Sequence, residues 1–376
     1  MAKYLPVPGP SSSSSPSPLL AAGVLLLLCG LVGIAPADAC TAYLLERGAD
    51  RAVCRNYDFN TGEAMLLTNP RGLGKEGQVS RNPAHWTARY GSLTLNQFGR
   101  ELPLEGMNEA GLVVATLWLD ETVLPADTTR PGLSSLQWVQ YMLDQAGTVQ
   151  EALALDSTVT VAPGAGSTVH FFLADGKGGC AVVEYLGGRS IHHTGNGMRA
   201  RVITNDTYEN STRYLDHLKP FGGTEDVPTD MSSLARFARA ARYQQRFATE
   251  ADRSLVDYGF ASLASVSSGM ATQWSVVYDL GTRQVWLRTQ RNQQIRTVDL
   301  ASLDFAPQGP ARMLAIDEGK GDLRSSFVPY TTQANRDLIF RVFGQVEFLA
   351  GVPSEAKEAL ARFPEDLRVP AAARTR

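Results

Sequence analysis

This chain contains few histidines and few cysteines, and its positive and negative charges nearly balance. Its 376 residues include five histidines and four cysteines, and neither an H-E-x-x-H nor a C-x-x-C pattern occurs. Because the usual spacings of zinc ligands are missing, we expect no metal site and no cofactor. The formal net charge of −3 gives no basic footprint for nucleic acid. With 44% hydrophobic and 19% charged residues, the composition also excludes disordered and fibrous classes.

The first 39 residues carry the three-part pattern of a secretory signal peptide. Lys3 and a Ser/Pro run precede an apolar stretch, 19–35, which ends in Pro36 and the small-x-small sequence Ala37-Asp38-Ala39. We expect cleavage after Ala39, export, and no membrane anchor on the mature chain. An uncleaved anchor helix fits less well because Pro36 and Asp38 interrupt the run. A lipoprotein signal also fits poorly, since Ala37 stands where an apolar residue, usually Leu, is expected.

Cleavage there would make Cys40 the first residue of the mature chain. A thiolate is the nucleophilic form of cysteine, and a free thiol has a pKa of about 8.5. An α-amino group titrates near ~7.7–8.0, so a freed Cys40 would carry its own general base. Nucleophile and base would then belong to one residue, with no histidine required.

Residues 40–58 predict a β-hairpin around a turn at Gly48-Ala49. Paired positions would sum to 97, which sets Cys40 opposite Tyr57 and places Arg55 and Asp58 beside it. Their spacing of three requires a bulge or a strand end for both to reach Cys40. There, Arg55 would favour the thiolate and Asp58 would hold the α-amine. The alternative is an ordinary salt bridge at a sheet edge.

These residues belong to a series of short motifs that run in order along most of the chain. The series resembles the choloylglycine hydrolase and penicillin V acylase family of N-terminal nucleophile hydrolases. The blocks that carry the resemblance begin with Cys40 and continue with Arg55-Asn56-Tyr57-Asp58, 69–72 (NPRG), 106–112 (GMNEAGL), Val202-Ile203-Thr204-Asn205, Ala235-Arg236-Phe237 and 272–279 (TQWSVVYD).

The resemblance implies a role for each matching residue. Cys40 takes the place of the nucleophile, with Arg55 and Asp58 in the block that supports it. Asn205 takes the place of an oxyanion-hole donor; composition alone predicts a turn there. Arg236 takes the place of an active-site arginine, although a solvated helix arginine is the ordinary interpretation, and Ala235 replaces the family's serine.

Trp118 stands where relatives carry Asn or Tyr, at a position linked to substrate choice. Its backbone N–H would serve as a second oxyanion donor, and its indole would wall an apolar acyl pocket. A buried core tryptophan is the equally good alternative. Cys54 and Cys180 also remain after cleavage; export permits a disulfide between them, and buried thiols are at least as well supported.

The order of strands, helices and strands again predicts one α+β domain over 40–376. The resemblance sharpens this to a four-layer αββα sandwich. Strands are expected at 41–45, 52–59, 112–119, 169–173, 181–185, 273–278, 284–289 and 293–298. Helices are expected at 134–145, 149–155, 233–247 with Asp230 as a cap, and 335–348; 364–376 is expected to be a loose tail.

The leading hypothesis is an exported amidase, in a bacterial periplasm or secreted, that cleaves a linear amide between a bulky apolar acyl group and a polar amine. Penicillin V acylase-like activity is favoured by the aromatic residue at position 118, with acyl homoserine lactones and conjugated bile salts as alternatives. A hypothesis from another class is an inactive envelope binding protein. The resemblance also implies a homo-oligomer, a tetramer or a dimer, although the stretch between Asn205 and Arg236, which helps relatives assemble, is short here.

Overall fold

The computed structural model describes residues 40–127, 129–164, 168–250, 252–307 and 309–368. The expected signal peptide lies outside these residues. Within them, no helix combines the length and apolar character needed to cross a membrane.

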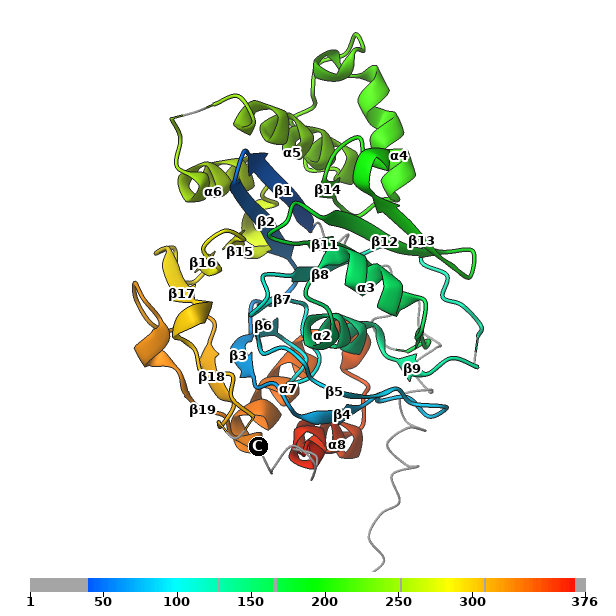
Figure 1. Cartoon of the computed structure of the whole chain (residues 1–376), viewed down its shortest axis with the longest axis vertical. Helices are drawn as coiled ribbons and strands as arrows, with labels where there is room; N and C mark the ends of the chain where they lie inside the picture. The colour runs from blue at the N-terminus through cyan, green and yellow to red at the C-terminus, as the bar shows by residue number, and fades with distance from the viewer. Residues whose placement is uncertain (1–39, 128, 165–167, 251, 308, 369–376) are drawn as a thin grey trace, which may run out of the picture.

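Two large antiparallel sheets form the centre of the molecule (Figure 1). The first contains six strands in the spatial order β14 (Val202–Ile203), β1 (Thr41–Arg47), β2 (Asp50–Asp58), β15 (Thr272–Asp279), β16 (Gln284–Thr289) and β17 (Arg296–Asp299). The second contains nine, in the order β13 (Arg189–Thr194), β12 (Cys180–Leu186), β11 (Val169–Ala174), β8 (Val113–Trp118), β7 (Glu105–Asn108), β6 (Ser92–Asn96), β3 (Met65–Asn69), β18 (Arg312–Ala315) and β19 (Val328–Pro329). Two strand pairs stand apart, β4 (Gly74–Glu76) with β5 (His85–Thr87) and β9 (Gly132–Leu133) with β10 (Thr160–Val161).

Helices cover the outer face of each sheet. In the six-stranded sheet, α5 (Ser233–Phe247) packs on β1, and α6 (Leu255–Ser265) packs on β2 and β15. On the nine-stranded sheet, α2 (Ser135–Gln145) packs on β7 and β8, and α3 (Val149–Asp156) lies next to α2. Figure 1 shows this layering, and it confirms the expected αββα sandwich.

Apolar side chains fill the space between the layers. One cluster joins the two sheets and includes Val53 and Phe172; a second joins the nine-stranded sheet to α2, where Trp138 stacks on Phe171 with ring centroids 4.1 Å apart. Strands such as β1 and β8 are therefore buried on both faces and carry nearly continuous apolar runs. Three further helices complete the fold: α4 (Tyr208–Tyr214), α7 (Thr332–Gln345) and α8 (Ser354–Arg362).

The first hairpin has the predicted register. Thr41 pairs with Asn56 and Arg47 with Asp50, so paired positions sum to 97. Gly48 adopts a φ of +60°, which a glycine tolerates in such a turn. Asp58 is the last residue of β2, and the neighbouring strand β15 shifts register opposite it. The strand end thus supplies the irregularity that the spacing of Arg55 and Asp58 required.

Several details differ from the sequence prediction, and three of them concern where elements begin or end. The N-cap of α5 is Ser232, whose hydroxyl accepts from the Ala235 N–H, while Asp230 bonds to the backbone of Ser232 one step earlier. The last strand of the six-stranded sheet starts at Arg296, three residues late. The first part of the expected loose tail is ordered: residues Phe363–Asp366 form a 3₁₀ turn, and residue 368 forms a β-bridge with Gly74. Residues 369–376 lie outside the described part.

Candidate active site

Cys40 lies immediately before β1 and lines a cavity. It is buried, and its thiol donates to the carbonyl oxygen of Asp58, 3.7 Å away. The first hairpin therefore brings the end of β2 against the sulfur, as the register predicts.

Arg55 is fully buried behind this point, so the interpretation as an edge salt bridge was wrong. Its Nε lies 2.9 Å from Oε1 of Glu105, and its Nη2 donates to the carbonyl of Thr116 at 2.7 Å. Glu105 also accepts from the indole of Trp274 and the hydroxyl of Tyr278, each at 2.8 Å. Burial lowers the pKa of Arg55, but the charge and hydrogen bond of Glu105 together with the charges of Cys40 and Tyr278 outweigh burial, and the net effect raises that pKa. The result is a fixed cation close to the sulfur.

Asp58 also contributes a carboxylate to the lining of this cavity. Its Oδ2 accepts from the hydroxyl of Ser268 at 2.9 Å, whereas Oδ1 is buried and accepts no hydrogen bond from a described residue. Burial raises the pKa of Asp58 above its ordinary value, against the opposing charges of Arg236 and Arg55. An acceptor in this position suits an α-ammonium group.

Arg236 is buried rather than solvated, and it joins the nucleophile to Asn205. Its Nη1 donates to the carbonyl of Cys40 at 2.5 Å and to the hydroxyl of Thr41 at 2.7 Å. Its Nη2 donates to Oδ1 of Asn205 at 3.0 Å. Helix α5 is held against β1 partly by these bonds, so the helix places the guanidinium inside the site. Burial lowers the pKa of Arg236, and the charge of Asp58 opposes that effect.

The hydrogen-bonding partners of Asn205 determine which way its side-chain amide is oriented. Its Oδ1 faces the donor-only guanidinium of Arg236, and its Nδ2 donates to the carbonyl of Trp118 at 2.9 Å. The bond to Trp118 uses one of the two amide hydrogens.

A cluster of histidine and carboxylate side chains contacts the backbone of Thr204, the residue before Asn205. His170 Nε2 lies 2.7 Å from the carbonyl of Thr204, and its Nδ1 lies 3.3 Å from Glu184. Glu184 also contacts His193 at 3.0 Å and accepts from the N–H of Tyr208 at 2.8 Å. Burial opposes ionisation of Glu184, but these contacts dominate and lower its pKa to about 2. Sequence reasoning missed this cluster, because its members come from separate strands with no shared motif.

Trp118 ends β8 and is only half-buried, so it lines the cavity instead of the core. Its indole donates to Asp120 at 2.6 Å. Along β8, the N–H of Leu119 donates toward β11 and that of Thr116 donates to Leu104 on the opposite side. Since successive amides alternate, the N–H of Trp118 is directed to the same side as that of Thr116.

The cavity beside Cys40 is strongly apolar. Its open space amounts to about 1200 Å³ when the mouth is included. Most of the lining is aromatic or aliphatic, and the side chains come from the end of β2 and the residue after it, the loop before β7, β8, β11, α2 and the C-terminal segment with α7 and α8. They include Phe59, Phe98, Leu102, Leu104, Leu117, Trp118, Leu136, Val169, Phe343, Phe348, Leu349, Val352 and Leu360. The site can therefore hold a large apolar group next to a sulfur nucleophile.

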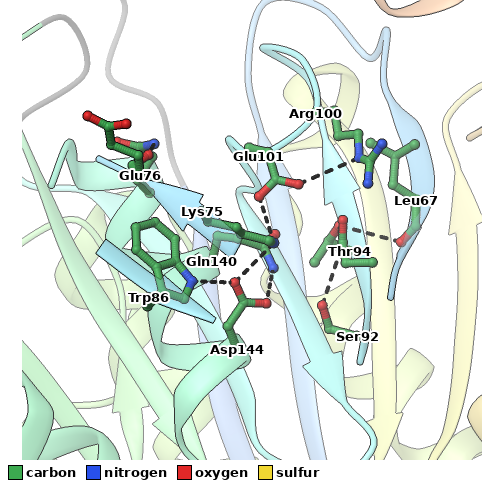
Figure 2. A network of polar contacts seen from close by, with 12 residues as sticks. Leu67, Lys75, Glu76, Trp86, Ser92, Thr94, Arg100, Glu101, Gln140 and Asp144 are labelled. Carbon is green, nitrogen blue, oxygen red and sulfur yellow. Dashed lines mark hydrogen bonds and ion pairs between the residues drawn. The ribbon is translucent and has the colours of Figure 1, made fainter. Parts of the chain in front are cut away.

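A buried charged cluster fixes the elements around the cavity (Figure 2). Lys75 on β4 lies 2.7 Å from Glu101 and 3.0 Å from Asp144 on α2. Asp144 also accepts from the indole of Trp86 and the amide of Gln140, each at 2.8 Å. Figure 2 shows how these side chains converge from β4, β5, α2 and the loop before β7. Each of these elements or its adjoining loop contributes lining residues, so the cluster holds part of the cavity wall in place.

Cys54 and Cys180 are free thiols and form no disulfide. Burial raises the pKa of both well above that of an ordinary thiol, so neither is poised to act as a nucleophile. Among the described residues, no group of three or more histidine, cysteine or acidic side chains is arranged to hold a metal ion.

The sandwich and the arrangement around its first strand are those of an N-terminal nucleophile hydrolase that acts on linear amide C–N bonds. Residues 40–313 match the family model described as linear amide C–N hydrolases, choloylglycine hydrolase family, and the chain belongs to this family.

The chain is 28% identical over 331 residues to a penicillin V acylase of Pectobacterium atrosepticum, an alignment that covers 76% of this chain and 87% of the relative. It is 26% identical to a bile salt hydrolase/transferase of Bifidobacterium longum subsp. longum, with 67% and 92% covered. Among solved structures, the penicillin V acylase from Agrobacterium tumefaciens aligns with a TM-score of 0.69 at 26% identity, covering 78% of this chain and 98% of that one. The conjugated bile acid hydrolase from Clostridium perfringens, at 17% identity and a TM-score of 0.62, shares the fold.

Proposed function

We propose that this protein is an exported N-terminal cysteine amidase that releases a bulky apolar acyl group from a polar amine. The observation that carries the proposal is the buried Cys40 in the lining of an apolar cavity, with Asp58 against its thiol and Asn205 linked to its carbonyl through Arg236. The relatives named penicillin V acylase, together with the aromatic residue Trp118, support penicillin V or a similar acyl amide as substrate. Acyl homoserine lactones are also candidates, because they too join an apolar acyl group to a polar amine.

In the proposed reaction, cleavage after Ala39 frees the α-amine of Cys40, and Asp58 holds it. The amine takes the thiol proton while Sγ bonds to the carbonyl carbon of the substrate. The oxyanion is stabilised by the Nδ2–H of Asn205 and the backbone N–H of Trp118. The ammonium then protonates the leaving nitrogen as the C–N bond breaks and a thioester remains.

Hydrolysis of the thioester reverses these roles. The α-amine removes a proton from water, and the hydroxide oxygen bonds to the acyl carbon. The C–S bond breaks, the thiol regains its proton, and the carboxylic acid leaves. Arg55 lowers the cost of the thiolate in both halves of the reaction, because its buried cation lies close to the sulfur.

One side-by-side assay tests this proposal. Penicillin V, a long-chain acyl homoserine lactone and glycocholate would be compared by kcat/KM, with Cys40→Ser as the inactive variant and Cys180→Ser as a control for losing a buried thiol. We expect Cys40-dependent cleavage, fastest for penicillin V or the lactone, and a mature N-terminus at Cys40 by mass spectrometry.

Each other outcome has a definite meaning. Faster cleavage of glycocholate would make the enzyme a bile salt hydrolase, the competing substrate class. Full activity of Cys40→Ser, or of chains with an unprocessed Cys40, would exclude the mechanism. Cleavage of none of the three, with Cys40 alkylated no faster than an ordinary exposed thiol, would favour an inactive binding protein.

A further inference from the structure

The C-terminal helices lie outside the family match and yet line the cavity beside Cys40. The matched residues end at 313, whereas α7 begins at Thr332. Six apolar residues beyond the match face the cavity: Phe343, Phe348, Leu349, Val352, Ala356 and Leu360. In Figure 1, α7 and α8 (orange and red) lie together at the end of the molecule away from α5.

This segment is tied firmly to the body of the fold. Asn335 on α7 is fully buried; its Oδ1 accepts from the backbone N–H of Arg100 at 2.8 Å, and its Nδ2 donates to the carbonyl of Ala361 at 3.1 Å. The ring of Phe343 packs against Phe98 with centroids 6.4 Å apart. The segment is therefore a fixed wall, joined by side-chain bonds to the loop that carries other lining residues.

The wall reaches the reacting end of the cavity. The ring centroid of Phe348 lies 6.1 Å from that of Trp118, whose carbonyl binds Asn205. Phe348, Ala356 and Leu360 remain half-buried although they line an apolar cavity, so they present apolar surface to its open space. A ligand chain that begins at Cys40 would run between Trp118 and this wall.

We propose that residues 332–366 form an acyl-chain subsite that takes a flexible aliphatic chain and sets the preferred chain length. This proposal rests on the proposed amide hydrolysis, because it says where the acyl group of the amide substrate binds. The cavity offers no array of polar groups on this wall to recognise a hydroxylated ring system, whereas an alkyl chain needs only apolar contact. Each methylene buried there should improve kcat/KM about threefold to fourfold.

The test separates binding from turnover. Cys40→Ser chains would be titrated calorimetrically with N-dodecanoylglycine and N-butanoylglycine, with Phe348→Ala or Ala356→Phe added. Phe340→Ala is the matched control, because Phe340 lies on α7 outside the cavity lining and stacks on Arg336.

We expect Phe348→Ala and Ala356→Phe to weaken binding of the dodecanoyl compound at least tenfold and that of the butanoyl compound less than twofold. Phe340→Ala should change neither by more than twofold. The proposal is overturned if the dodecanoyl compound does not bind, or binds no more tightly than the butanoyl one, or if Phe348→Ala behaves like Phe340→Ala.

Hydrolysis of the same two compounds by chains that retain Cys40 distinguishes the two proposals. Chain-length-dependent binding without Cys40-dependent cleavage of these two compounds or of any amide in the side-by-side assay would refute the proposed function and leave the subsite standing. Cys40-dependent cleavage with no discrimination by Phe348→Ala would refute the subsite alone.

Discussion

Glu105→Gln should destabilise the fold strongly, because it leaves the buried guanidinium of Arg55 without its counter-charge. Both side chains are 0% exposed and lie 2.9 Å apart. Glu105 also accepts from Trp274 and Tyr278, and an amide in its place turns one acceptor into a donor. Removing one partner of a buried pair costs about 3–5 kcal/mol, and we expect a loss of that size in the free energy of unfolding.

Urea unfolding at neutral pH, followed by tryptophan fluorescence, would measure this loss from the midpoint and slope. The matched control is Glu209→Gln, which breaks a pair with Arg213 whose side chains are 75% and 64% exposed; its expected cost is about 0.5 kcal/mol or less. The double variant Arg55→Leu, Glu105→Leu should be more stable than Glu105→Leu alone. If Glu105→Gln cost less than about 1 kcal/mol, the argument from an unpaired buried charge would be refuted.

Three further predictions concern the site and its support. Asn205→Ala should lower kcat about 10²- to 10³-fold in steady-state assays with KM little changed; an unchanged kcat would remove Asn205 from the oxyanion hole. Glu184, with its pKa lowered from 4.5 to about 2, contributes about 3 kcal/mol of stability above pH 4.5 that is lost as the pH falls toward 2. The stability gap between wild type and Glu184→Gln should therefore shrink from pH 6 to pH 3, and a constant gap would contradict the assignment. Iodoacetamide should label Cys40 in the folded protein and reach Cys54 and Cys180 only after unfolding; peptide mass mapping would show early labelling of either as a failure.

Local patterns predicted the elements that carry the nucleophile. The turn at Gly48 and the apolar runs on either side predicted the first hairpin and its register, because strand pairing follows directly from the position of the turn. The alanine-rich helical pattern likewise predicted α5 with the bounds that the structure has, although its N-cap is Ser232 and not Asp230. The motif order then predicted which residues of these elements meet.

Local patterns failed where partners come from distant parts of the chain. Glu105 is 50 positions from Arg55 in the sequence, and nothing near either residue signals that they pair. Strands β3, β6 and β7 were missed because burial on both faces removes the alternation that marks a strand. Helix α8 was missed as well; Ala361 is its one fully buried residue.

Turn chemistry in the sequence determined the hairpin, and short-range periodicity determined an α+β order of elements. The αββα sandwich and the residues expected around Cys40 came from the resemblance of the sequence motifs to the family. Only the tertiary structure decided that Arg55 and Arg236 are buried, that Glu105 balances the first of them, and that the C-terminal helices wall the cavity. Burial and charge pairing depend on contacts between residues far apart in the chain, and those contacts exist only once the sheets and helices have packed.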